Sequence, residues 1–331
     1  MKKILVAAAI MMSMISCSKD QTISLNQEAI GFDNAFINNS TKSKEDPSFK
    51  DGNMFSDFAV FGFVEGAVLF DGIKVNKTIE NNDLKSAWKY EGTQYWIAGA
   101  NYNFNAVAPM TNGGWTKTSA DTDATTLSFT NNGTTDLLYA HTAQQGKVSG
   151  NSAVSFDFRH VLSKVKFSFT NGYNASNATI RVKDIQITDA YKTGNVVLND
   201  KSNWSDQTGT LVLQFGNAAL NSADAEEAIA YGNTIESYKE LLLIPGAGNT
   251  VKDSQNTYTV TFKVELLVSS EKVAEYNHTI YTPFVPEAGK SYDLVATITP
   301  ENIDPENKQE PIEFTVNTIN GWGTDIENKI N

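Results

Sequence analysis

Short segments in which every second residue is apolar recur along almost the whole chain. A period of two places successive side chains on opposite faces of a β-strand, so these segments predict strands. The clearest are Tyr102-Phe104-Ala106, Val154-Phe156-Phe158, Val165-Phe167-Phe169, Tyr258-Val260-Phe262-Val264-Leu266 and Tyr292-Leu294-Ala296-Ile298. Asn-Gly and Gly-rich sequences, which favour tight turns, lie between them. The chain is therefore predicted to be all-β, with strands packed as sandwiches.

Two segments depart from simple alternation. Phe58 to Phe63 carries apolar residues on both faces, because Phe58 and Val60 alternate with Ala59, Phe61 and Phe63. Ser222 to Ile229 places Ser and Asp before an Ala/Glu run, which predicts a short capped helix or a helical turn.

The length of the chain indicates two domains, since about 310 residues remain after the N-terminal segment described next. The polar stretch Thr170 to Asn177 separates two series of strands and sets the predicted boundary. We expect a signal peptide over 1–17, an N-terminal strand with an exposed processing loop over 18–50, and two β-sandwich domains over 51–172 and 173–331. The loop prediction rests on the charged, apolar-poor stretch Asn38 to Asp51.

The first residues, MKKILVAAAIMMSMISC, have the pattern of a lipoprotein export signal. Lys2 and Lys3 supply a positive start, the apolar run from Ile4 to Ile15 is short for a membrane span, and Cys17 follows a small residue. Because Cys17 is the one cysteine of the chain, it has no partner for a disulfide, and we predict that it is acylated and anchors the protein to a membrane. The alternative is an ordinary cleaved signal peptide.

The charge balance excludes nucleic acid as a partner. Removing Lys2 and Lys3 leaves 24 of the 26 basic residues against 38 acidic ones, so the mature chain carries a formal charge of −14. Binding to phosphates depends on an excess of Lys and Arg. The mature chain has an excess of acidic residues instead.

The sequence offers little catalytic chemistry. The three histidines, His141, His160 and His278, lack metal-ligand spacing, and no P-loop, dinucleotide or H-E-x-x-H motif is present. Sequence order alone leaves a Ser-His-Asp site open. Asp121-Thr122-Asp123 begins like a calcium loop but lacks the later Gly and Glu, so we interpret it as an acidic turn. We expect no enzyme activity, no cofactor and no metal.

A group of aromatic residues suggests a second possible role. Trp88, Tyr90, Tyr95 and Trp96 could form a platform on which sugar rings stack, although such residues more often pack in a core or at an edge. If these residues form such a platform, the protein would be a surface lipoprotein that binds glycans.

An ordered set of motifs resembles the fimbrillin family of Gram-negative anaerobes, the type V or FimA/Mfa-like pilins. The set includes AIGF at 29–32, STK at 40–42, FAVFGF at 58–63, FDFRHVLSKVKF at 156–167, LLLIPG at 241–246, GKSYDL at 289–294 and the closing Gly321-Trp322. The resemblance covers nearly the whole mature chain. It implies two transthyretin-like β-sandwich domains, export as a lipoprotein to the outer membrane, and assembly with other fimbrial subunits by donor-strand exchange. Surface glycans or proteins of the host or of other bacteria are further partners to consider.

In that family a protease removes the N-terminal strand. Here the resemblance points to a leaving strand from Thr22 to Phe36, with the apolar residues Ile23, Leu25, Ile30 and Phe32. Relatives are cut after an Arg, but this chain has no Arg before Arg159. Either a protease that accepts lysine cuts at Lys42, Lys44 or Lys50, or the chain stays uncut as an anchor or terminal subunit.

The C-terminal end offers a candidate donor strand with Ile312, Phe314 and Val316. The tail beyond Trp322 is short and weakly apolar, whereas a stalk subunit needs a donor about as long as an ordinary strand. This favours a tip, anchor or minor subunit unless the Ile312 strand itself swings out.

Overall fold

The computed structural model describes residues 28–37, 55–79, 86–199, 201–303 and 312–319. Within these ranges nearly all of the regular secondary structure is β-strand, which confirms the predicted all-β fold class. One short helix is described, α3 (Pro300–Ile303). No helix of the described part is long and apolar enough to span a membrane.

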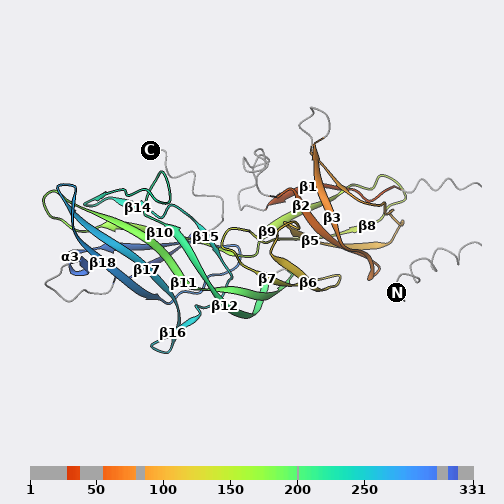
Figure 1. Ribbon diagram of the computed structural model, residues 1–331. Helices are drawn as coiled ribbons and strands as arrows, with labels where there is room; N and C mark the ends of the chain where they lie inside the picture. Colours follow the sequence, from red (N-terminus) through yellow and green to blue (C-terminus); the bar gives the residue numbers. More distant parts are fainter. Residues whose placement is uncertain (1–27, 38–54, 80–85, 200, 304–311, 320–331) are drawn as a thin grey trace, which may run out of the picture.

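Seven strands from the first half of the chain form a closed sheet, seen at the right of Figure 1. Its strands follow the order β1-β4-β3-β2-β5-β8-β9 around the sheet. Their bounds are β1 (Phe32–Ile37), β2 (Asp57–Val64), β3 (Ala67–Ile79), β4 (Ser86–Tyr90), β5 (Asn101–Ala108), β8 (Leu138–Gln145) and β9 (Val154–His160). Every pairing in this sheet is antiparallel except that of β1 with β9.

Two further sheets make up the other end of the molecule. The smaller one has the order β14-β10-β19-β20, with β15 also paired to β10. Its bounds are β10 (Ser163–Asn171), β14 (Thr234–Glu236), β15 (Leu241–Leu243), β19 (Ser291–Ile298) and β20 (Thr315–Ile319). The strand β10 runs parallel to β19 over eight residue pairs.

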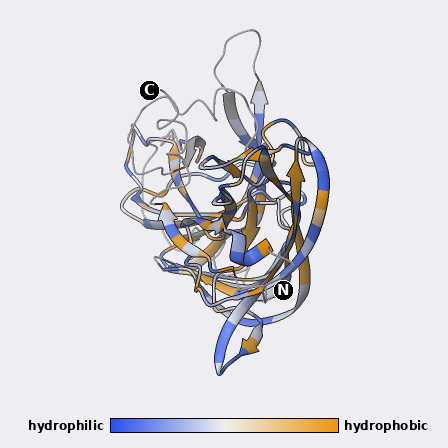
Figure 2. Cartoon of the chain, turned by 90° about the vertical axis from the view of Figure 1, so that its left-hand side faces the viewer, coloured by the Kyte–Doolittle hydropathy of each residue, from blue (hydrophilic) through white to orange (hydrophobic). Residues whose placement is uncertain are grey.

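The larger sheet has the order β16-β17-β11-β7-β6. In addition, β12 and β13 pair with β11, and β18 pairs with β17. Its bounds are β6 (Trp115–Ala120), β7 (Thr125–Thr130), β11 (Ala178–Leu198), β12 (Asn203–Gly216), β13 (Ile229–Ala230), β16 (Thr250–Lys252), β17 (Gln255–Val268) and β18 (Glu271–Thr282). Apolar and polar residues alternate along its long strands, as the colours of Figure 2 show.

The smaller and larger sheets pack face to face as a sandwich. Phe167 and Leu294 from the smaller sheet share one buried cluster with Ile180, Val260 and Val264 from the larger sheet. The predicted alternation along β17 is confirmed, because Tyr258, Val260, Phe262, Val264 and Leu266 are all buried. A second cluster fills the closed sheet.

Strand β2 lies between two cores. Phe58 and Val60 face the interior of the closed sheet, whereas Ala59, Phe61 and Phe63 belong to a third cluster that also contains residues of β7 and β11. This explains why the sequence is apolar on both faces here, because each face contacts a different part of the molecule.

Strand pairing crosses the predicted boundary near residue 172. β7 pairs with β11 along six residue pairs, and β10 lies in a sheet whose other strands all come later in the chain. The division into domains at that residue stays a prediction, as does the likeness of the two parts to transthyretin.

Of the short helix or helical turn predicted from Ser222 to Ile229, the helix is wrong and the turn is present, because the Ala225 N–H donates to the Ser222 carbonyl at 3.2 Å. The chain makes a turn at Ala223 and Asp224, and Ile229 begins the short strand β13. Asn217 holds this connection by donating from its side-chain amide to the carbonyl of Ala225 at 3.1 Å, so local hydrogen bonds compete with a helix that is too short to be stable alone.

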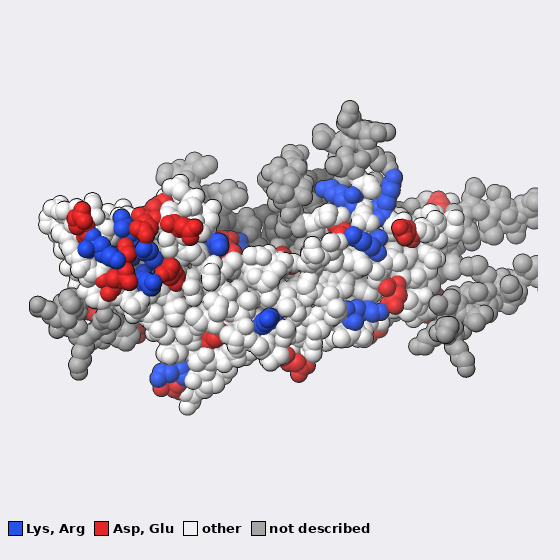
Figure 3. All heavy atoms as spheres, viewed as in Figure 1, with Lys and Arg blue, Asp and Glu red and all other residues white. Residues whose placement is uncertain are grey.

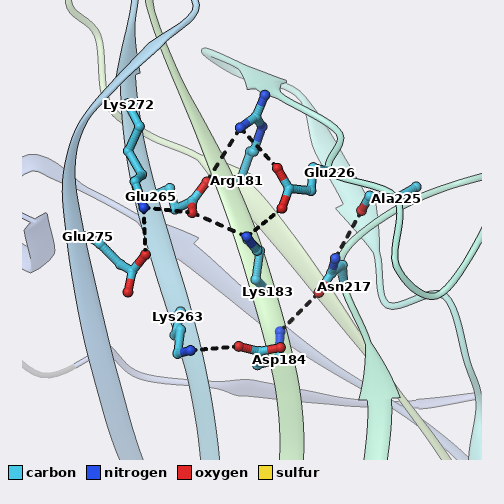
Figure 4. A network of polar contacts seen from close by, with 10 residues as sticks. All are labelled: Arg181, Lys183, Asp184, Asn217, Ala225, Glu226, Lys263, Glu265, Lys272 and Glu275. Atoms are coloured by element: carbon cyan, nitrogen blue, oxygen red, sulfur yellow. Dashed lines mark hydrogen bonds and ion pairs between the residues drawn. The ribbon is translucent and has the colours of Figure 1, made fainter.

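Charged side chains gather on the outer face of β11, β17 and β18, at the left of Figure 3. Figure 4 shows that Glu265 lies at the centre of this group, with its carboxylate 3.2 Å from Lys183, 3.4 Å from Lys272 and 3.5 Å from Arg181. Glu226 contacts both Lys183 and Arg181. Although it points outward, Glu265 is only 3% exposed, because these side chains cover it.

Candidate functional site

The candidate site is the slot that the first described strand occupies in the closed sheet. β1 lies between β4 and β9 and closes the ring of strands. It pairs in parallel with β9 from Phe32 opposite Val154 to Ile37 opposite Phe158, and with β4 through Phe32 opposite Trp88. Without β1, the facing backbone groups of β9 would have no partner strand in the described structure.

The residues just before β1 extend the same contact. The Ile30 N–H donates to the carbonyl of Gln94 at 2.8 Å, and the Trp96 N–H donates to the carbonyl of Glu28 at 3.0 Å. The Tyr90 hydroxyl donates to the carbonyl of Ile30 at 2.8 Å. The segment from Glu28 to Ile37 is thus held by backbone hydrogen bonds on both sides.

Ile30 and Phe32 are the apolar anchors of this segment, with exposed fractions of 1% and 5%. The Phe32 ring enters a cluster of five aromatic side chains, those of Phe58, Phe70, Tyr90, Phe104 and Phe156. Burying such a ring is worth several kcal/mol, about 3–5 kcal/mol when measured by truncation to Ala. These two residues of the predicted leaving strand are therefore part of the core.

A polar contact fixes the start of the segment. The Glu28 carboxylate accepts hydrogen bonds from the Asn151 N–H at 2.6 Å, the Gly150 N–H at 2.7 Å and the Asn151 side-chain amide at 2.8 Å. The backbone N–H groups of Asn151 and Gly150 lower the pKa of Glu28, because they stabilise its ionised form. Sequence reasoning missed Glu28, since its partners lie more than a hundred residues away and no local pattern connects them.

Several predicted site residues lie outside the described residues. These are the lipidation site Cys17, the apolar residues Ile23 and Leu25, and the candidate cleavage sites Lys42, Lys44 and Lys50. The positions of the three lysines in the chain are still informative, because β1 ends at Ile37 and β2 begins at Asp57. A cut at any of them would separate β1 from the rest of the chain.

The candidate donor strand lies at the other end of the molecule. Ile312 is buried, and the Phe314 ring contacts the rings of Phe167, Phe169 and Phe262 at 5.4 to 6.1 Å. Val316 lies in β20, which begins only at Thr315 and pairs with β19 through five residue pairs. In this chain the segment thus covers the core between the smaller and larger sheets. The structure does not bring it near β1.

The four aromatic residues considered for sugar binding do not form a platform. Trp88 is 8% exposed and packs on Phe55 and Phe58, and Trp96 is 4% exposed and packs on Tyr102. Tyr90 is half-buried beneath Phe32, and Tyr95 is the exposed member of the set. The core interpretation of the two tryptophans is therefore confirmed.

The histidines serve local structure. His160 is buried and pairs with Asp136, and His141 contacts the side-chain oxygen of Asn105 at 2.8 Å. His278 stacks on Phe262, and burial lowers its pKa. In the described ranges no group of His, Cys, Asp and Glu side chains could hold a metal ion.

Asp121 forms the acidic turn predicted from its sequence. Its carboxylate accepts hydrogen bonds from the N–H groups of Asp123 at 2.9 Å and Ala124 at 2.8 Å. The side chain thus stabilises its own turn, as Asp commonly does.

Comparisons with solved structures find similar chains at low identity. A protein described as a cell adhesion protein of Parabacteroides distasonis matches with a TM-score of 0.48 and 11% identity, covering 89% of this chain and 96% of that one. One from Bacteroides ovatus matches with a TM-score of 0.45 and 16% identity, covering 90% and 98%. One from Bacteroides uniformis matches with a TM-score of 0.44 and 14% identity, covering 89% and 98%. No curated protein sequence matches the chain.

The family comparison gives a direct assignment. The model of the fimbrillin-like family matches residues 41–322, which is most of the chain. The resemblance inferred from the sequence motifs is thereby confirmed, and the chain belongs to the fimbrillin-like family.

Proposed function

We propose that the protein is a structural and adhesive subunit of a cell-surface fimbria, and that it has no enzymatic activity. It would be exported as a lipoprotein, acylated at Cys17 and held at the outer membrane. Its partners would be copies of itself or other fimbrial subunits. Membership of the fimbrillin-like family supports the fimbrial role.

The observation that carries the proposal is the place of β1 in the closed sheet. A strand from the N-terminal region fills a slot between β4 and β9, and every predicted cleavage site lies between this strand and β2. A cut there, followed by release of β1, would leave an unpaired strand edge above the aromatic cluster around Phe58 and Phe156. An extended segment from another subunit would pair with that edge and cover that cluster.

The strand that refills the slot would come from a neighbouring subunit. Ile312, Phe314 and Val316 are the candidate donor residues, and the second step of assembly would release β20 from β19 and Ile312 and Phe314 from the core that they cover. A chain that stays uncut would keep β1 in place and would serve as a tip or anchor subunit, because its slot would accept no donor.

Limited proteolysis of the purified mature protein tests this proposal. A lysine-specific protease is expected to cut at Lys42, Lys44 or Lys50, and mass spectrometry would locate the cut. Detergent-resistant oligomers should then appear on a gel run without boiling. The matched control is a variant in which all three lysines are Gln, and this variant should stay monomeric under the same treatment.

Two results would count against assembly by strand exchange. One is a clean cut that leaves monomers alone even at high protein concentration. The other is the formation of identical oligomers by the triple lysine variant, because those oligomers could not depend on the release of β1.

A further inference from the structure

Two distant segments of the chain share one sequence pattern. Residues 27–32 read QEAIGF and residues 309–314 read QEPIEF, so both have the form Gln-Glu-x-Ile-x-Phe. An Ile follows five residues after the Phe in each case, at Ile37 and Ile319. The first segment leads into β1, and the second leads into β20.

The shared positions are those at which the slot contacts side chains. The Glu28 carboxylate accepts three hydrogen bonds from the loop residues Gly150 and Asn151. The side chains of Ile30 and Phe32 are buried in the core of the closed sheet. The slot thus favours an acidic residue, then an aliphatic residue two positions later, then an aromatic residue two positions after that.

The first position at which the two segments differ has Ala29 in the first segment and Pro311 in the second. Ala29 is exposed, and the bridge to Tyr95 is made by the N–H of Ile30 and the carbonyl of Glu28. No described partner accepts a hydrogen bond from the Ala29 N–H. Because the proline ring replaces this N–H, a proline here would cost no hydrogen bond.

The second position at which the two segments differ, Gly31 against Glu313, has room for a Cβ atom. A Cβ atom added to Gly31 would lie 4.0 Å from the Cβ of Ala153, an ordinary van der Waals distance, and the backbone of Gly31 is not in the left-handed region. The carbonyl of Gly31 accepts from the Val154 N–H at 2.8 Å, and a Glu backbone offers the same acceptor. Neither difference therefore removes a backbone hydrogen bond between the slot and its strand.

We propose that the slot recognises the pattern Glu-x-Ile-x-Phe and that residues 309–319 of a second copy of this chain replace residues 27–37 position for position. In this register Glu310 takes the place of Glu28 on the 150–151 loop, Ile312 that of Ile30, and Phe314 that of Phe32. The inference rests on the proposed function, because the slot must first be vacated. It assigns the partner, the register and a polar anchor, Glu310, to the exchange.

Synthetic peptides test this register without altering the fold of the protein. Mature protein cut in the 38–54 loop would be incubated with a fluorescent peptide of residues 309–320, and binding would be followed by anisotropy. The peptide of residues 27–38 is the positive control, and uncut protein is the negative control. We expect both peptides to bind cut protein and neither to bind uncut protein.

Peptide variants separate the shared from the variable positions. Glu310→Ala and Phe314→Ala should each weaken binding at least about tenfold, because each removes a side chain that the slot contacts. The matched controls Pro311→Ala and Glu313→Gln should stay within about twofold of the parent peptide. Equal effects at all four positions would overturn the register.

A disulfide provides a second measurement of the register. Asp33 pairs with Ser155, so Thr315 of the peptide should lie opposite Ser155. With oxidised glutathione as the oxidant, a Thr315→Cys peptide should form a disulfide with cut Cys17→Ser/Ser155→Cys protein. It should do so much less with cut Cys17→Ser/Asp157→Cys protein, in which the cysteine is displaced along the same strand. Preference for position 157 would overturn the register.

The outcomes distinguish this inference from the proposed function. If the 27–38 peptide binds cut protein and the 309–320 peptide does not, the slot is exchangeable but the assignment of its occupant is wrong. If neither peptide binds although the loop is cut, strand exchange itself fails, and with it both proposals.

Discussion

The ring of Phe32 stacks on that of Phe156, with 5.9 Å between the ring centroids and 23° between the ring planes. The two residues are 124 positions apart, and their contact joins the first described strand, β1, to β9. Phe32 also contacts four other aromatic rings. The N-terminal strand is therefore part of the core of the closed sheet, and its loss is expected to have a large effect on stability.

Replacing Phe32 by Ala is expected to destabilise the uncut protein by about 3–5 kcal/mol, because it leaves a cavity among five aromatic side chains. Chemical denaturation followed by tryptophan fluorescence would measure the change. Val68→Ala is the matched control, since Val68 lies on β3 of the same sheet with 57% of its surface exposed. A Phe32→Ala protein no less stable than the control would show that β1 does not contribute to the core.

The contact of Glu28 with the 150–151 loop should control local opening at the start of the segment. Glu28→Ala removes the acceptor of the Gly150 and Asn151 N–H groups, so we expect their hydrogen exchange to accelerate on the order of tenfold or more. The Asn101 N–H is an internal control, because it donates to Glu65 in another turn. Unchanged exchange at Gly150 and Asn151 would contradict a role for Glu28 in holding the strand.

The buried tryptophans should matter for folding and not for sugar binding. Trp88→Ala is expected to lower stability by about 3–5 kcal/mol, because the indole ring fills the space between Phe55 and Phe58. Tyr95→Ala should leave stability nearly unchanged, since that ring is 46% exposed. Retention on insoluble polysaccharides should be the same for wild type and for Tyr95→Ala; a loss of retention in Tyr95→Ala without a loss of stability would revive the glycan-binding hypothesis.

Much of the strand structure could be predicted from the sequence, because the alternation of apolar and polar residues that marks a strand lies within a few neighbouring residues. Along β17 every second residue from Tyr258 to Leu266 is apolar and buried, and the two apolar faces of the segment at Phe58 anticipate its two cores. At Ser222, where the sequence allowed a helix or a turn, the Ala/Glu run is too short to be stable as a helix alone, and the hydrogen bond from the Asn217 side chain to the Ala225 carbonyl helps to hold the turn.

The site was only partly predictable because its contacts are distant in sequence. Ile30 and Phe32 stood out as an apolar pair, but no local pattern indicates that β1 runs parallel to β9 or that Glu28 binds residues 150 and 151. The sequence also left open whether Trp88 and Trp96 were exposed, because the local sequence does not distinguish an aromatic residue of a core from one of a binding platform. Burial in the folded chain decides between the two.

The charged group around Glu265 should make stability depend on pH at acidic values. Burial alone would raise the pKa of Glu265, but the hydrogen bond from Lys183 and the charges of Lys183 and Lys272 outweigh it and lower that pKa below its ordinary value of 4.5. A carboxyl group with a lowered pKa in the folded state contributes stability that is fully present above its unfolded pKa and is lost as the pH falls through the folded pKa. Glu265 should therefore stabilise the protein at neutral pH and lose that effect below about pH 4.5.

Glu265→Gln tests this dependence. We expect a loss of roughly 1–3 kcal/mol at pH 7, because three cations lose a charged partner, and a smaller difference from wild type as the pH falls below about 4.5. Urea denaturation at a series of pH values would measure both effects. Glu271→Gln is the matched control on the neighbouring strand β18, where Glu271 is exposed. A difference between Glu265→Gln and wild type that stays constant from pH 7 to pH 3 would mean that the side chain acts through packing, since a contribution from its charge must vanish once the carboxylate is protonated.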